Sequence, residues 1–322
     1  MKESKYKQER KAHKEEISDF TEWLQKRNYA KDTIRADSNY AASYLQWITK
    51  NKIQIPEATY NDLLTYIDHS TTKGDSKTLL NRKLSAIRKY YDYLLYKGKA
   101  VKNPATGLFI KNKQHTIPSN LLTLEELTAI YENYQVTDLR SQRNKVMIGL
   151  LVFQALTREE IEKLEITDIK LNAGKIEIPG GKHSNPRTLK LESLQMLDLQ
   201  EYISITRPAI HKGEGIYKIG RKPDSINKEE AQNQLFVSMH GSGIIKNSFL
   251  HLLYALRRNN PKLTNAQQIR QSVITLWLKT KDLRTTQYMA GHKYVSSTER
   301  YQVNQLDDLQ DALNQFHPLR TL

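Results

Sequence analysis

The stretch EITDIKLNAGKIEIPGGKHSNPRTLKL, residues 165–191, decides the fold class because its pattern differs from that of the segments around it. It holds three short segments, EITDIKL, KIEIPGG and RTLKL, in which β-branched and other apolar residues alternate with polar ones. Gly, Asn and Pro lie between the segments and are typical of tight turns. The stretch predicts a small antiparallel sheet inside a helical domain. We therefore predict a mainly α fold with a small antiparallel β-sheet, an α+β class.

Length and charge limit the class of protein. The chain has 322 residues, more than one hydrophobic core usually serves, so two domains are expected. Fifty Lys and Arg face 35 Asp and Glu, for a formal net charge of +15. This excess favours nucleic acid as the partner over a basic surface that is merely solvated.

Other features of composition concern the compartment. The sequence has no cysteine, which excludes disulfides and thiolate metal sites. Its first residues, MKESKYKQERKAHKEE, are polar without an apolar region, and no run of eighteen apolar residues occurs. We therefore predict a cytoplasmic protein with no membrane partner.

Four helical patterns fill the amino-terminal part, over 15–27, 31–51, 59–70 and 76–98. In the last of them apolar residues recur at helical spacing, so one face is expected to be buried. Basic residues lie mainly off that face, where phosphate contact is favoured over simple solvation. The predicted DNA-binding residues are Lys77, Arg82, Lys83, Arg88 and Lys89.

Changes in composition predict the domain boundaries. Residues 1–13 form a basic arm, which either docks on phosphates or is disordered. A helical domain is expected over 14–102, and NPATGLFIKNKQHTIPSN, residues 103–120, has the composition of a linker. The second domain is then 121–322. The polar stretch 210–232 has no role that the sequence reveals.

The carboxyl-terminal part holds the most distinctive spacing. In MAGHKYVSSTERYQ, residues 289–302, a Gly-His pair precedes a tyrosine by nine residues. Beyond it LDDLQDALNQF, residues 306–316, is a short amphipathic pattern. A helix of this length is marginal alone, so its apolar face must pack on its own subunit or on a neighbouring one.

The order of these motifs resembles the tyrosine recombinases, the integrases of phages and mobile elements, over nearly the whole chain. The resemblance implies a helical, SAM-like core-binding domain and a catalytic domain, which together form a C-shaped clamp on double-stranded DNA, the expected partner. It also implies a homotetramer on synapsed DNA, with the terminal helix docking in trans, and allows a DNA-bending accessory protein. A tyrosine would cut DNA through a 3′-phosphotyrosyl bond, with no metal or other cofactor.

The resemblance assigns roles residue by residue. Tyr301 matches the nucleophile, and His292 the imidazole that donates to the phosphate. Arg270 in AQQIRQS matches an arginine that clamps the phosphate with a bidentate fork. Lys182 matches the lysine of a hairpin turn that protonates the leaving oxygen, a role for which the adjacent His183 could compete.

The first departure from the family pattern lies in ALTREEIEKL. The family expects an arginine three residues before a glutamate, and Thr157 stands at that spacing from Glu160. Thr157 and Glu160 also make a good capping box. Either Arg158 bends inward, or another arginine such as Arg140 or Arg143 substitutes, or the enzyme works with one clamp fewer.

The second departure is Gln267, which stands where the family has a histidine. Its amide can still donate a hydrogen bond to a phosphate oxygen, but it has no charge and cannot relay a proton. Gln267 therefore remains a candidate catalytic residue with a reduced role.

These departures keep other functions open. The first hypothesis is a site-specific recombinase of a mobile element. The alternative is a DNA-binding protein of the same fold with reduced or lost catalysis, and a third is the relaxation of supercoils in the manner of type IB topoisomerases. The target DNA sequence, and the choice between integration, excision, inversion and resolution, cannot be read from one chain.

Overall fold

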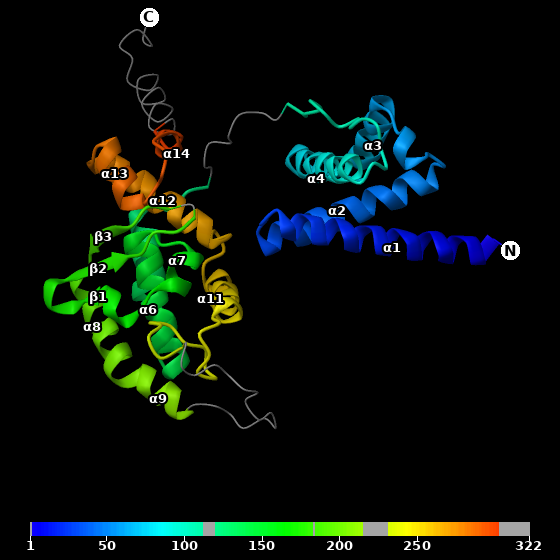
Figure 1. The fold of residues 1–322 in the computed structure, drawn as a ribbon. Helices are drawn as coiled ribbons and strands as arrows, with labels where there is room; N and C mark the ends of the chain where they lie inside the picture. The colour runs from blue at the N-terminus through cyan, green and yellow to red at the C-terminus, as the bar shows by residue number, and fades with distance from the viewer. Residues whose placement is uncertain (1, 112–119, 183, 215–230, 303–322) are drawn as a thin grey trace, which may run out of the picture. The chain divides into compact units, whose positions relative to one another are not determined.

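The computed structural model describes residues 2–111, 120–182, 184–214 and 231–302, which divide into two compact units at residue 114 (Figure 1). Each unit has its own cluster of buried apolar side chains. Together the elements confirm the mainly α fold with one small antiparallel sheet. Within the described ranges, no helix has both the length and the apolarity needed to cross a membrane.

The first unit is helical throughout. Its elements are α1 (Lys2–Lys26), α2 (Lys31–Lys50), a 3₁₀ turn (Ile55–Glu57), α3 (Tyr60–Thr72) and α4 (Lys77–Tyr96). Helix α2 packs against both α1 and α4. The core between them is rich in aromatic rings, and the hydroxyls of Tyr44 and Tyr91 meet within it at 3.0 Å. Burying both rings also satisfies their polar ends.

The predicted basic arm is helical from Lys2 onward. Helix α1 begins at Lys2, so residues 2–13 belong to the same helix as residues 14–26. The physical reason is local, because this segment contains no Gly or Pro and consists largely of good helix formers. Docking of this segment on phosphates stays a prediction.

The second unit surrounds α6 (Leu139–Gln154), whose residues are nearly all buried. Helices α5, α8 and α12 contact it. The other helices, which vary from four to fifteen residues, are α5 (Leu124–Glu132), α7 (Arg158–Lys163), α8 (Ser193–Glu201), α9 (Arg207–Lys212), α11 (Lys246–Asn259), α12 (Ala266–Thr280), α13 (Leu283–Ala290) and α14 (Ser296–Glu299). A π-helical turn, Tyr202–Thr206, joins α8 to α9.

The predicted sheet is present, with strands β1 (Ile169–Lys170), β2 (Lys175–Ile178) and β3 (Arg187–Lys190) in that order. Both pairings are antiparallel, and Ile176 lies opposite Ile169 on one side and Leu189 on the other. Alternate residues are buried, as the period of two requires. Arg187 occupies a buried position of this pattern, so β3 carries a charged residue into the interior.

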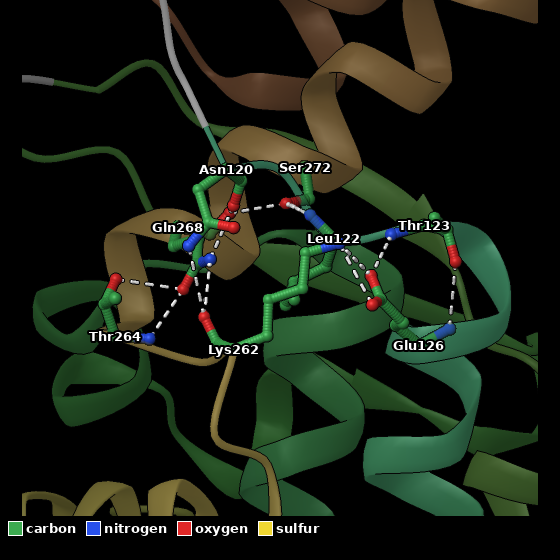
Figure 2. A network of polar contacts seen from close by, with 8 residues as sticks. All are labelled: Asn120, Leu122, Thr123, Glu126, Lys262, Thr264, Gln268 and Ser272. Atoms are coloured by element: carbon green, nitrogen blue, oxygen red, sulfur yellow. Dashed lines mark hydrogen bonds and ion pairs between the residues drawn. The ribbon is translucent and has the colours of Figure 1, made fainter.

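A polar network joins the start of the second unit to α12 (Figure 2). The side-chain amide of Gln268 donates to the carbonyls of Asn120 and Lys262 at 2.6 and 3.0 Å. The hydroxyl of Ser272 accepts from the backbone N–H of Leu122 at 2.8 Å. These contacts fix α12, the helix that carries Arg270, against the segment that enters the unit.

Candidate active site

Glu160 lies at the centre of the candidate site. Its helix α7 begins with a capping box, in which Thr157 Oγ1 accepts from the Glu160 N–H at 3.2 Å and Glu160 Oε2 accepts from the Thr157 N–H at 2.8 Å. The capping prediction is therefore confirmed. The carboxylate is 5% exposed and has two arginines beside it. Thr157 thus caps α7, and position 157 carries no guanidinium where the family pattern has one.

Arg270 is one of these arginines. Its Nη1 lies 3.8 Å from Glu160 Oε2 and also donates to the carbonyl of Ala155. Its Nη2 donates to the carbonyl of Ala290 at 2.6 Å. Ala155 ends α6 with a positive φ of 52°, which turns that carbonyl away from the helix. The ends of α6 and α13 therefore hold the predicted phosphate-binding guanidinium in place.

Arg187 of β3 is the second arginine, and the sequence analysis missed it. Its side chain is fully buried, and Nη1 donates to Glu160 Oε1 at 2.6 Å. A Cβ on Gly291 would lie 2.4 Å from this Nη1, so the glycine leaves room for the guanidinium. The signal was available, because strand alternation places Arg187 on the same face as Leu189, where a charged residue is rare.

The charge on Glu160 is strongly favoured by this arrangement. Burial alone would raise the pKa of its carboxyl. The hydrogen bond and charge of Arg187, the Thr157 amide and the charge of Arg270 outweigh burial and lower the pKa to about 2. Glu160 is therefore an anion at neutral pH, and the two arginines share it.

His292 and Tyr301 come together at the end of the described chain. Gly291 ends α13 in the left-handed region, with φ of 67°, and turns the chain into His292. The imidazole and the Tyr301 ring are stacked, with centroids 6.2 Å apart and planes 9° apart. His292 Nδ1 lies 2.8 Å from Thr298 Oγ1. Tyr301 is fully buried, and its hydroxyl accepts from Arg300 Nη2 at 2.9 Å.

His292 is held in its neutral form. Burial, followed by the positive charges of Arg270, Arg300 and Arg187, lowers its pKa to about 4, although Glu160 acts in the opposite direction. A neutral imidazole has one donor and one acceptor nitrogen. When Thr298 donates to Nδ1, Nε2 carries the hydrogen and can donate to an anion.

Lys182 lies in the turn between β2 and β3 and is exposed. The turn is attached to the histidine segment, since Asn185 N–H donates to the Gly291 carbonyl at 2.9 Å and the Asn185 amide to the His292 carbonyl at 3.4 Å. A Cβ on Gly180 would lie 2.7 Å from Pro186, so the turn needs glycine there. The hairpin that carries Lys182 is thus anchored beside His292. His183 lies outside the described residues.

The substitutes expected for the missing arginine lie elsewhere. Arg158 forms its ion pair, within the described chain, with Glu162 at 3.6 Å, because its position on α7 is rotated from that of Thr157. Arg143 is buried and donates to the Val237 carbonyl at 3.0 Å. Arg140 is exposed near the start of α6. None of these three lies beside Glu160 among the described residues, whereas Arg187 of β3 does, and a catalytic role for Arg158 stays a prediction.

Gln267 is exposed in the first turn of α12, where its role stays a prediction. The adjacent Gln268 is the buried residue of the pair and makes the contacts of Figure 2. The terminal pattern 306–316 lies outside the described residues.

Three of the five predicted DNA-binding residues have partners inside the first unit. Lys83 pairs with Asp75, and Lys89 pairs with Asp37 at 2.6 Å. Arg88 donates to the carbonyls of residues 105 and 108 at 3.1 and 2.9 Å. Lys77 and Arg82 are exposed. The prediction of phosphate contact is therefore best supported for these two.

Comparison with known proteins identifies the family to which this fold belongs. The chain belongs to the phage integrase family: the model described as "Phage integrase family" matches residues 120–307. The model described as "Phage integrase, N-terminal SAM-like domain" matches residues 17–98.

Similar individual proteins include two tyrosine recombinases named XerD. The one from Staphylococcus epidermidis is 24% identical over 307 residues, which cover 94% of this chain and 98% of the relative. The one from Halalkalibacterium halodurans is 26% identical over 298 residues, covering 91% and 93%.

Two solved structures share the fold. The XerH site-specific recombinase, in a post-cleavage complex with palindromic difH substrate, gives a TM-score of 0.68 at 18% identity, covering 89% of this chain and 80% of that one. The Tn1549 transposon integrase, in complex with transposon right end DNA, gives 0.62 at 15% identity, covering 94% and 99%.

Proposed function

We propose that this site-specific tyrosine recombinase breaks and rejoins double-stranded DNA with Tyr301 as its nucleophile. The observation that carries the proposal is the stacked pair of His292 and Tyr301 beside the buried pair of Arg270 and Glu160. These residues come from three separate segments of the chain. A protein that only bound DNA would not need a phenol, an imidazole and a guanidinium in one place.

In the proposed reaction Tyr301 Oη attacks the phosphorus of the scissile phosphodiester. The phenol loses its proton to solvent as a bond forms between Oη and phosphorus, the bond to the 5′-oxygen breaks, and that oxygen takes a proton from the Lys182 ammonium. Arg270 stabilises the extra negative charge on the non-bridging oxygens, and His292 donates from Nε2. Gln267 is proposed to add a neutral hydrogen bond. The reverse attack by a 5′-hydroxyl rejoins the strand.

The nucleophile must move before it can react. Tyr301 is fully buried and its hydroxyl is held by Arg300, so the phenol cannot reach a phosphate as it stands. We propose that DNA binding displaces the segment 300–302 and exchanges the hydrogen bond from Arg300 for contact with the phosphate.

The wider assembly is also proposed. DNA would be held between the core-binding and catalytic domains, with Lys77 and Arg82 on phosphates of the duplex. The XerH and Tn1549 integrase structures, both in complex with DNA, support DNA as the partner. The proposal also includes a homotetramer in which the terminal helix docks in trans, and a DNA-bending accessory protein. It further includes a cytoplasmic location and a mobile element as the source of the DNA that is recombined.

A nicked suicide site tests the proposal. DNA that flanks the reading frame and carries short inverted core sites is the substrate, and the protein should give a covalent adduct that resists SDS. Tyr301→Phe should bind the same DNA and give no adduct. Peptide mapping that places the nucleotide on another residue would overturn the assignment of Tyr301. Tight binding without any adduct by the wild type would establish the catalytically silent alternative.

A further inference from the structure

Arg187 has hydrogen-bonding capacity that the described chain does not use. Its guanidinium donates to Glu160 through Nη1, whereas Nε and Nη2 are buried and have no hydrogen-bond partner among the described residues. A buried charged donor without a partner is costly, and such groups in native proteins require an explanation. Arg207 uses its donors on three backbone carbonyls, and Arg143 leaves only its Nε without a partner, whereas Arg187 leaves two of its three nitrogens without one.

The charges of the cluster do not balance. Among the described residues, Glu160 is the single carboxylate within ion-pair distance of Arg187 or Arg270. Its Oε1 is 2.6 Å from Arg187, and its Oε2 is 3.8 Å from Arg270. Two guanidiniums and one carboxylate leave one excess positive charge in a buried place. Because Arg187 has the shorter contact, it neutralises most of the carboxylate.

Arg270 therefore keeps its charge for another anion. Its two hydrogen-bonded partners are the neutral carbonyls of Ala155 and Ala290, which orient the guanidinium without cancelling its charge. Without Arg187, Glu160 would pair with Arg270 alone and would neutralise the Arg270 guanidinium. The cluster would then have no excess positive charge.

The place of Arg187 also links it to the histidine. Its Nη1 lies under Gly291, where a Cβ would be only 2.4 Å away, and His292 is the next residue. Threonine at position 157 supplies a cap but no cation to this cluster. Resting on the proposed function, we infer that Arg187 is a positioning residue that supplies, from β3, the positive charge that position 157 lacks, and so keeps Arg270 free for the scissile phosphate.

Three variants test the inference: Arg187→Gln, Arg187→Lys, and Arg187→Gln combined with Thr157→Arg. The readout is the rate of adduct formation in a single turnover on the nicked site, with DNA saturating and the rate normalised to folded protein. Arg187→Gln should lower the rate about 100-fold while the dissociation constant for DNA changes less than about threefold. Arg187→Lys should keep more activity, and adding Thr157→Arg should recover about tenfold.

Arg143→Gln is the matched control, because Arg143 is equally buried in the same unit and lies outside the cluster. It should lower stability and leave the normalised rate unchanged. Rescue by Thr157→Arg separates the inference from a structural role, since a new guanidinium at position 157 cannot refill the space under Gly291. Absence of rescue, or a wild-type rate for Arg187→Gln, would overturn the inference.

A second measurement does not depend on catalysis. The groups that face His292 are Arg270 of α12, Arg187 of β3, Glu160 of α7, and Thr298 and Arg300 of its own segment. Removing the Arg187 cation should raise the pKa of His292, observed by NMR of labelled histidine and assigned with His292→Gln. An unchanged pKa would overturn the inference. If the wild type forms no adduct, the proposed function fails, and this titration alone then decides for or against the electrostatic role of Arg187.

Discussion

The helical core of the first unit and the Glu160 cluster of the second unit bury cations in different ways. In the first unit each partly buried cation has a partner of its own: Lys83 has Asp75, Lys89 has Asp37, and Arg88 has two backbone carbonyls. In the second unit Arg187 and Arg270 share the single carboxylate of Glu160.

The difference teaches how to separate a structural cation from a functional one. A cation that fixes a fold has its hydrogen-bond donors occupied by partners of its own, and at Lys83 and Lys89 these partners are carboxylates that neutralise the charge. A site that must bind an anion keeps positive charge that is not neutralised and hydrogen-bond donors that are not paired, although burying them is unfavourable. Exposure alone did not distinguish the two cases, since both sets of cations are at least partly buried.

Breaking the shared carboxylate should have the largest effect. Glu160→Gln leaves two guanidiniums beside one another without an anion, so we expect about 3–5 kcal/mol less stability and loss of DNA cleavage. Urea unfolding followed by circular dichroism measures the loss. Glu162→Gln, on the same helix but in a more exposed pair with Arg158, should cost less than about 1 kcal/mol. Equal losses in the two variants would contradict the central place of Glu160.

Breaking a neutral pair in the first unit should have a smaller effect that is confined to stability. Lys89→Met leaves the buried Asp37 carboxylate without its cation, and we expect a loss of about 1–3 kcal/mol. Adding Asp37→Leu should recover part of it. DNA affinity and its dependence on salt should not change, and a salt slope lower by about 1 would show instead that Lys89 contacts a phosphate.

The pH dependence of stability tests the excess charge near His292. The folded pKa of His292, about 4, lies below the ordinary value of 6.5 for histidine, so the folded state takes up this proton less readily than the unfolded state. The contribution of His292 to stability is complete above pH 6.5 and is lost as the pH falls towards 4. We expect about 1–2 kcal/mol of loss between pH 7 and pH 5, measured by urea unfolding. His292→Gln should remove that component, and an unchanged pH profile in the variant would contradict the lowered pKa.

The smallest effect on stability is expected at the exposed cations. Lys77→Ala and Arg82→Ala should change the free energy of unfolding by less than about 0.5 kcal/mol. Each should weaken DNA binding and lower the salt slope by about 1, as loss of one phosphate contact requires. Fluorescence anisotropy with labelled duplex at several salt concentrations measures both quantities, and affinities equal to wild type would place the DNA on another surface.

Much of the fold could be predicted because its signals are local. Strand alternation and turn residues predicted the sheet, and the Thr157–Glu160 spacing predicted a capping box that the structure contains. The sequence analysis did not anticipate that the segment before residue 14 continues helix α1 as far as Lys2. The order of motifs identified the candidate site residues. The distances between these residues, and how exposed each one is, could not be predicted because no local sequence pattern encodes them.

The sequence by itself determined the types of the elements, the basic charge, and the candidate catalytic side chains at 270, 292 and 301. The tertiary structure alone decided which cations are paired within the protein and which keep positive charge or hydrogen-bond donors without a partner among the described residues. Arg187 and Glu160 are 27 residues apart and meet only because β3 and α7 pack together. Ion pairing depends on distances of a few ångströms and on exclusion of water, and neither is written in the order of residues along a chain.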